Sequence, residues 1–254
     1  MALSCAYYAN GQNKIGDFYI TWGYHSDHYT RSNLHFKDNQ TDDYNFTLER
    51  AKAKDKPDMH DFFNTPLTVP QYSFNFGYFF AKKSDWGIEV SWDHLKYVVI
   101  DNQTMHLKGD IRGKHYDLDT LVTPGFVHFE HTNGNNYGMI SGVKRFPLMG
   151  GKHNRVYRLS LLTKVGIGGL VPKTDSYIFG QHNDGPFRLS GYVIGVSGCL
   201  RYDFYRFFYL EGSMKGAFAN YTDAKLYEQG RAKHTFFSLQ YIWSAGINIP
   251  LSSL

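Results

Sequence analysis

The chain has 254 residues, with 27 Lys and Arg against 23 Asp and Glu, and a formal net charge of +4. Tyr and Phe occur 20 times each, yet the mean hydropathy is −0.43. A membrane protein built from helices is excluded because no apolar run reaches about 18 residues. The basic residues are scattered rather than clustered, so binding to nucleic acid is not indicated.

The first 15 residues are expected to form a lead-in to the folded domain. Ser4 and Ala6 are two small residues at the spacing that a signal peptidase prefers, so residues 1–15 are interpreted as a signal-peptide remnant and lead-in. Cys5 lies between them. Cys199, the second of the two cysteines, is expected to be a small strand residue without a disulfide partner.

Apolar and polar residues then alternate along most of the chain, as expected for β-strands with one apolar face. In the first predicted strand, Phe18, Ile20, Trp22 and Tyr24 share a face. The strands predicted in this way span 17–24, 29–36, 44–51, 72–80, 86–99, 104–111, 120–130, 137–145, 157–167, 187–202, 207–218 and 235–249.

The last predicted strand, 235–249, shows the pattern most clearly. Its odd positions from Phe237 to Ile249 are apolar, and its even positions, such as Gln240 and Asn248, are mostly small or polar. An ordinary globular strand has roughly 5–6 residues, whereas a tilted strand that crosses a bilayer needs about 9–11. The length and the alternation therefore favour a strand that crosses a membrane.

The connections alternate between short and long, as in outer-membrane barrels with short periplasmic turns and longer outer loops. The segments 82–85 and 203–206 are short, while 53–69, 171–186 and 220–231 are long and polar. Residues 133–136 contain Gly134 and are predicted to form a hairpin turn.

These features predict an all-β fold. The expected architecture is a transmembrane antiparallel up-and-down β-barrel formed by one domain, residues 16–254, with both termini in the periplasm. The expected number of strands is about 12, or ten if 29–36 and 104–111 belong to loops. The alternative is a soluble β-sandwich or lipocalin-like barrel.

Alternation also places charges of both signs on the inner face of the predicted barrel. In a narrow barrel these side chains are expected to pair and fill the tube; the alternative is a selective conduit lined by charged rings. The predicted lumen charges are Glu49, Glu89, Asp93, His128, Arg158, Lys164, Glu211 and Lys215.

One stretch, 129–136, contains a candidate for catalysis at the outer rim. His131 is expected on the lipid-facing side beside Phe129, where a histidine general base next to a hydroxyl could attack an ester. The stretch is similar to the His-x-Ser-Asn-Gly segment of outer-membrane lipid A 3-O-deacylases, but Thr132 follows His131 and no Ser occupies the expected place. Glu130 is the third candidate.

Metal and cofactor sites are not indicated by any motif. The inward trio Asp93, His128 and Glu130 has ligand chemistry suited to a metal, but the sequence does not fix the distances between them. We therefore expect no cofactor and no metal.

Segments along nearly the whole chain resemble a group of uncharacterised outer-membrane barrel proteins of Bacteroidetes and some proteobacteria. The resemblance implies a Gram-negative outer-membrane protein and implies no activity. The segments are Phe-Tyr-Ile-Thr-Trp-Gly-Tyr at 18–24, Asn-Leu-His-Phe at 33–36, Tyr-Asn-Phe-Thr-Leu at 44–48, Ala-Lys-Ala-Lys-Asp-Lys-Pro at 51–57, Trp-Asp-His-Leu-Lys-Tyr-Val-Val at 92–99, Phe-Glu-His-Thr-Asn-Gly at 129–134 and Leu-Val-Pro-Lys-Thr at 170–174.

The function expected from these observations is that of an integral outer-membrane β-barrel. It would have a non-enzymatic structural or accessory role, or act as a narrow, porin-like channel. Its partners would be membrane lipid or lipopolysaccharide and a protein bound through the outer loops. The alternative is a lipid A-modifying hydrolase that acts through His131.

Overall fold

The computed structural model describes residues 16–56, 70–80, 84–150, 157–205 and 207–250. The signal-peptide remnant expected at 1–15, with Cys5, and residues 57–69 of the long loop expected at 53–69 lie outside these ranges. In the described residues, fifteen strands form one antiparallel sheet. No helix among them is long and apolar enough to cross a membrane.

Eight of the strands form a closed ring. The ring order is β1-β5-β6-β9-β10-β13-β14-β15, and β15 pairs again with β1 from Pro250 opposite Asp17 to Ser238 opposite Tyr29. Closure leaves these strands without a free edge. The ring strands are β1 (Asp17–Tyr29), β5 (Tyr72–Phe79), β6 (Trp86–Val99), β9 (Val127–Met149), β10 (Tyr157–Pro172), β13 (Gly191–Phe204), β14 (Phe208–Lys225) and β15 (Arg231–Pro250).

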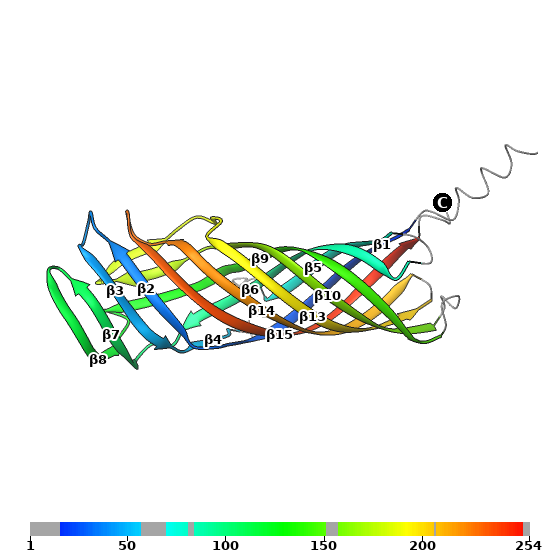
Figure 1. Cartoon of the computed structure of the whole chain (residues 1–254), viewed down its shortest axis with the longest axis horizontal. Helices are drawn as coiled ribbons and strands as arrows, with labels where there is room; N and C mark the ends of the chain where they lie inside the picture. Colours follow the sequence, from blue (N-terminus) through cyan, green and yellow to red (C-terminus); the bar gives the residue numbers. More distant parts are fainter. Residues whose placement is uncertain (1–15, 57–69, 81–83, 151–156, 206, 251–254) are drawn as a thin grey trace, which may run out of the picture.

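The ring holds fewer strands than the twelve, or ten, expected from the sequence. The strands expected near 29–36, 44–51 and 104–111 do form, but they continue the sheet beyond one end of the barrel instead of joining the ring (Figure 1). We call this part the extension sheet. Its strands are β2 (Ser32–Asp38), β3 (Tyr44–Ala51), β7 (Gln103–Ile111) and β8 (Lys114–Val122).

The extension sheet joins the ring through β15, whose residues Arg231 and Lys233 lie opposite Lys37 and His35 of β2. Three short strands complete the sheet: β4 (Ala53–Lys54) pairs with β6, and the hairpin of β11 (Asp175–Ile178) and β12 (Gln181–Asp184) pairs with β9.

Two hairpins at this end have two-residue turns with positive φ at both positions. The turn residues are Arg112 and Gly113 (φ 51° and 76°) between β7 and β8, and Phe179 and Gly180 (φ 50° and 84°) between β11 and β12. This is the geometry of a type I′ turn, whose twist matches that of the flanking strands.

The hairpin turn predicted at 133–136 is wrong, because β9 runs without interruption from Val127 to Met149. Its partner β6 places Leu95 opposite Asn135 and Tyr97 opposite His131, so β9 has two more residues than β6 at this point. Gly134 has a φ of 146° there, which a residue with a side chain rarely adopts. The Gly and Asn residues of this segment therefore belong to a β-bulge.

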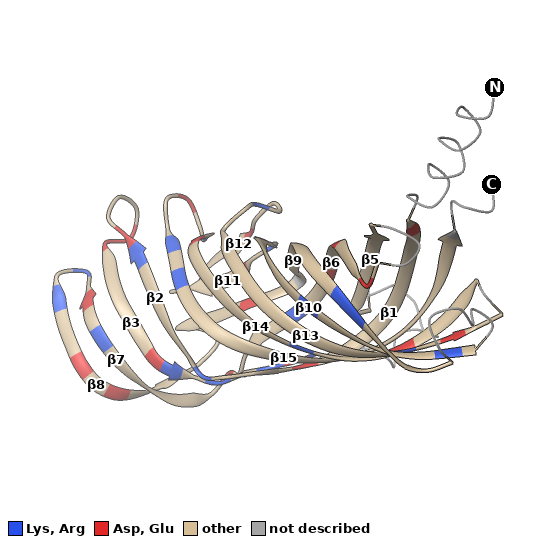
Figure 2. Ribbon diagram, turned by 45° about the vertical axis from the view of Figure 1, so that its right-hand side comes forward, with Lys and Arg blue, Asp and Glu red and all other residues tan. Residues whose placement is uncertain are grey.

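The outside of the ring carries an apolar band. Large apolar side chains on every ring strand point away from the lumen and stay exposed, and Trp243 reaches 75% exposure. A soluble barrel would cover this surface with polar groups, whereas a transmembrane barrel presents it to lipid. Charged residues are sparse over this part of the ribbon and gather on the extension sheet (Figure 2). The band includes Trp22, Phe76, Ile88, Trp92, Ile140, Val165, Ile167, Ile194, Val196, Met214, Phe237, Trp243 and Ile247.

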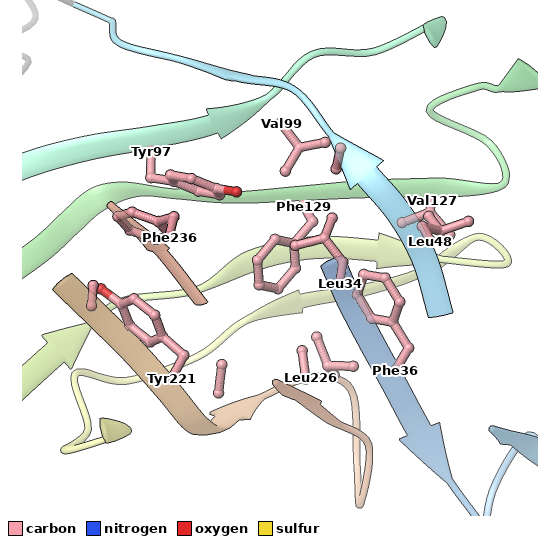
Figure 3. Close-up of a cluster of buried hydrophobic side chains, with 14 of the residues drawn as sticks. Leu34, Phe36, Leu48, Tyr97, Val99, Val127, Phe129, Tyr221, Leu226 and Phe236 are labelled. Atoms are coloured by element: carbon pink, nitrogen blue, oxygen red, sulfur yellow. The ribbon is translucent and has the colours of Figure 1, made fainter. Parts of the chain in front are cut away.

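Above the apolar band the polarity of the two faces is reversed. On β15, Phe237 points outward to lipid, but Thr235 and Lys233 on the same face are polar, and the inner residues include Ala232 and Phe236. The interior of this end is the main hydrophobic core, in which Leu34, Phe36 and Phe129 pack together (Figure 3).

Glycines on the inner wall make room for aromatic side chains from the neighbouring strand. Gly77 of β5 lies opposite Tyr19 of β1, and a Cβ at Gly77 would overlap the Tyr19 ring. That ring is fixed by a 2.8 Å hydrogen bond from its hydroxyl to Glu89 and by the Arg201 guanidinium above it. Gly198 on the outer face, by contrast, has open space where a Cβ would be.

We expect Gly77→Ala to lower the free energy of unfolding by about 1–3 kcal/mol, because the buried ring has no low-energy position to move to. Gly198→Ala is the matched control and should change it by less than about 0.5 kcal/mol. Urea titrations of the detergent-folded protein, followed by heat-modifiable electrophoresis, measure both. Equal midpoints for the two variants would contradict this account of the inner wall.

Candidate functional site

Buried ion pairs fill the barrel lumen along its length. Near the middle, Lys164 of β10 lies 2.7 Å from the carboxylate of Glu89 on β6, two strands away along the ring, and the Tyr19 hydroxyl donates to the same carboxylate. Both charged side chains are almost completely buried. The pair therefore links two strands that are not neighbours, because β9 lies between β6 and β10.

A second layer is centred on Arg201 of β13, which is fully buried and pairs with Glu211 of β14. Its guanidinium carbon lies 4.4 Å from the ring centroid of Tyr19 and 3.9 Å from that of Tyr209. The two terminal guanidinium nitrogens have no hydrogen-bond partner among the described residues. The faces of the two rings supply the compensating negative potential.

The third layer lies nearer the extension. Asp93 of β6 pairs with Lys215 of β14 and accepts a 2.6 Å hydrogen bond from Ser73. At the opposite end, Arg158 and Asp203 form a pair at 2.9 Å, and Asn248 donates to the same carboxylate at 2.8 Å. Each layer therefore contains an acceptor and a donor of opposite charge.

The space left between these layers is small. The lumen cavity has a volume of about 30 Å³ and is lined by the Glu89, Asp93, Lys164 and Lys215 side chains, with small residues such as Ser141. This volume holds about two water molecules. A hydrated ion or a solute does not fit into a cavity of this size.

An aromatic and histidine layer closes the lumen toward the extension. His131 of β9 and His234 of β15 approach to 3.2 Å between their Nε2 atoms, and Tyr221 stacks on both imidazoles. Tyr97 stacks on Phe236 at 4.6 Å between centroids beside them (Figure 3). All five side chains are buried.

Burial dominates the protonation of the two histidines, which lie beyond the apolar band. Desolvation lowers the pKa of His131 to about 3, and desolvation together with the neighbouring His131 lowers the pKa of His234 well below its usual range. Thr174 lies 3.1 Å from Nδ1 of His131. With Thr174 donating, the Nε2–H of His131 donates to His234, so both rings are neutral.

The structure corrects the expected position of His131. It was expected on the lipid-facing side, but its side chain has no exposed surface and points into the core of the extension. Phe129 lies on the same inner face. The hydroxyl next to His131 is that of Thr174; the Thr132 hydroxyl is buried and has no hydrogen-bond partner among the described residues. An ester in a lipid cannot reach His131 in this arrangement.

Two of the predicted lumen charges lie outside the lumen. Glu49 is on β3 of the extension sheet, opposite His106 of β7. His128 pairs with Asp101 at 2.8 Å and lies 3.8 Å from Glu130, also in the extension. The reason is the reversed polarity above the apolar band, where the apolar face is the inner one. The remaining predicted lumen charges, Glu89, Asp93, Arg158, Lys164, Glu211 and Lys215, point into the barrel and take part in the ion pairs described above.

The trio suggested for a metal is not assembled. His128 and Glu130 are neighbours, but Asp93 pairs with Lys215 inside the barrel. No group of three or more His, Cys, Asp or Glu side chains in the described part of the chain is arranged to hold a metal ion.

A polar pocket on the outer face of the extension was missed by sequence analysis. It has a volume of about 430 Å³ and lies where β2 meets the upper ends of β14 and β15. We call it the basic pocket; its lining includes His35, Lys37, Thr222, Asp223, Arg231 and Lys233. Alternation in 231–237 places Arg231 and Lys233 on the face of Phe237, but only the fold brings Lys37 beside them.

No family model matches the chain, and no curated protein matches it. Solved structures of small outer-membrane proteins are similar to it at low identity. The protein OprG from Pseudomonas aeruginosa is 12% identical, with 93% of this chain and 97% of that chain covered and a TM-score of 0.44. The attachment invasion locus protein Ail of Yersinia pestis, solved with the heparin analogue sucrose octasulfate, is 14% identical, with 92% and 99% covered and a TM-score of 0.37. Neisserial surface protein A is 11% identical, with 92% and 97% covered and a TM-score of 0.35.

The buried pair of Lys164 with Glu89 predicts a specific pattern of stability. Lys164→Met should lower the free energy of unfolding by about 3–5 kcal/mol, because the buried Glu89 carboxylate loses its counter-charge. Adding Glu89→Leu to Lys164→Met should restore most of that loss. The exposed pair of Lys173 with Asp184, at 2.9 Å, is the control, and Lys173→Met should cost at most about 1 kcal/mol. A double variant as unstable as the single one, in urea titrations, would refute the pairing.

The two buried histidines predict acid sensitivity of the extension. A histidine whose pKa is lowered on folding contributes stability above its unfolded pKa near 6.5, and this contribution is lost as pH falls toward about 3. Between pH 7.5 and pH 5 we expect each histidine to contribute a loss of about 2 kcal/mol, so a local opening of β2 and the upper end of β14 that exposes both should lose about 4 kcal/mol.

Amide hydrogen exchange at the two pH values, corrected for intrinsic rates, measures this opening. The variant His131→Leu/His234→Leu should lose less stability than the wild type over the same range. The control is His106→Gln, which removes an exposed histidine of the extension sheet and should leave the acid loss in place. If the double variant lost as much stability at pH 5 as the wild type, His131 and His234 would not be the source of the acid sensitivity.

Proposed function

We propose that the chain is an integral protein of a Gram-negative outer membrane. In this proposal the closed barrel is an anchor, and the extension sheet is the functional part, which projects from the membrane and binds a partner there. The role is non-enzymatic.

One observation carries the proposal. Buried ion pairs lie at successive levels of the lumen, and four further strands form a sheet beyond the apolar band. A pore would need an open lumen, because conduction requires a continuous path for ions. A sheet with its own hydrophobic core and a polar outer face suits a binding surface.

The connections support one orientation. Ring strands are joined by short turns at the end where β1 begins and β15 ends, for example between Phe204 and Phe208. All the extra strands lie at the other end. Outer-membrane barrels place short turns in the periplasm and long connections outside the cell. On this basis both termini would be periplasmic and the extension sheet would be extracellular.

Reconstitution in planar bilayers and cysteine labelling test the proposal together. We expect no stable conductance steps from the folded, heat-modifiable protein under conditions where a large porin conducts. In cells, Lys114→Cys on β8 should react with a membrane-impermeant maleimide, and Ser84→Cys at the opposite end should react only after permeabilisation, both in a background with Cys5 replaced by Ser. Regular conductance steps would overturn the anchor role, and labelling of Ser84→Cys in intact cells would overturn the orientation.

A further inference from the structure

The basic pocket lies on the part of the outer face that continues the lipid-facing surface. Phe237, Thr235, Lys233 and Arg231 share one face of β15 because side chains alternate along a strand. Lys233 is four residues beyond Phe237, which is roughly 13 Å along the strand at about 3.3 Å per residue. In the orientation proposed above, the pocket therefore stands just above the hydrocarbon layer, at the height of the sugar and phosphate groups of the outer leaflet.

Positive charge in the basic pocket is incompletely neutralised. Asp223 lies between Arg231, at 2.9 Å, and Arg188, so its carboxylate is already shared by two arginines. Asp38 is buried, and its Oδ1 accepts hydrogen bonds from the backbone N–H groups of Gln40 and Thr41.

The two lysines of the pocket remain without a counter-charge. Neither Lys37 nor Lys233 has an ion-pair or hydrogen-bond partner within the described residues. Both are close enough to His35 that, after desolvation, their charges are the next causes that lower the pKa of its imidazole. Two exposed ammonium groups and one arginine thus converge on a concave surface.

The rest of the lining fits a saccharide. Asn39, Gln40, Thr222 and Gln229 place amide and hydroxyl groups around the basic residues. Such groups donate to and accept from sugar hydroxyls, whereas Lys and Arg bind phosphate oxygens. The volume of about 430 Å³ is within the range of small-molecule sites.

We propose that the basic pocket binds a phosphorylated saccharide, namely the phosphate-bearing headgroup of a glycolipid in the outer leaflet beside the barrel. Lys37 and Lys233 would hold the phosphate oxygens, and the amides and hydroxyls would hold the sugar. This inference rests on the proposed location of the protein in an outer membrane. It adds a ligand class and a site to the proposed binding role.

The test compares two glycolipids that differ only in phosphate. The full-length protein is placed in nanodiscs of phosphatidylethanolamine that contain either lipopolysaccharide or enzymatically dephosphorylated lipopolysaccharide. Glycolipid that stays bound after mild detergent extraction is then quantified by mass spectrometry. We expect the wild type to retain the phosphorylated form at least tenfold better than the dephosphorylated form. The variant Lys37→Glu/Lys233→Glu should lose this preference.

Lys108→Glu is the matched control. Lys108 lies in the same cross-strand row as Lys233, His35 and Thr47, but it is already 3.7 Å from Asp117 and lies outside the pocket. This variant should keep the wild-type preference. Equal retention by the wild type and Lys37→Glu/Lys233→Glu, or an equal loss in Lys108→Glu, would overturn the proposed site.

A second experiment, with a soluble ligand, distinguishes a free phosphate from a phosphate on a lipid headgroup. Isothermal titration of the detergent-purified protein with pyrophosphate should show weak binding that is lost in Lys37→Glu/Lys233→Glu. Binding of pyrophosphate as tight as that of the glycolipid would mean that a free phosphate is the ligand and would overturn the membrane-headgroup assignment. Failure of the site would leave the conductance and labelling results unchanged, so it is distinguishable from failure of the proposed anchor role.

Discussion

Closure of β1 on β15 is the constraint on which the rest of this structure depends. Within hydrocarbon, each unpaired backbone N–H or C=O group costs several kcal/mol, so a β-protein that crosses a bilayer needs a ring without edges. Here the ring closes with eight strands. Once it has closed, half of the side chains of each strand point into a narrow tube, and their polar groups have only one another as partners. The ion pairs of the lumen follow from the size of the ring.

The buried pairs do not explain stability by themselves, because the desolvation of two charges offsets most of their attraction. Their geometry suggests a different contribution. Glu89 pairs with Lys164 two strands away along the ring, and Asp93, on the same strand as Glu89, pairs with Lys215 on β14, the opposite strand of the ring. Strands that are not neighbours in the ring are thereby held at fixed relative heights. We infer that these pairs specify which walls face each other, while the backbone ladder and the apolar band supply the stability.

The sequence predicts where the strands lie better than it predicts which of them join the ring and what each face contacts. The alternation in 235–249 and the order of short and long connections indicate an antiparallel barrel of the transmembrane kind, and the structure places residues such as Glu89 and Lys215 inside it. The number of ring strands could not be predicted, because β2, β3 and β7 alternate in the same way as strands that cross the membrane. An apolar face meets lipid in the ring and a protein core in the extension. Which of the two a segment belongs to depends on pairings between residues that are distant in the sequence, such as Lys37 with Arg231.

The reversal of polarity between the ring and the extension explains why Glu49, His128 and His131 were all expected on the wrong face. In the membrane the outer face is apolar and the lumen is polar, whereas in the extension the core is apolar and the outside is polar. A single rule for the whole chain therefore places Glu49 and His128 inside and His131 outside, and each is on the opposite face. The same reversal also makes the outer face of the extension polar. Where the outward row of β15 passes from Phe237 to Thr235 and Lys233, a lipid-facing surface becomes a charged one without any change in the strand. A surface that is continuous in this way is what the proposed glycolipid site requires, because one molecule could then place its acyl chains against the aromatic side chains and its headgroup against the lysines.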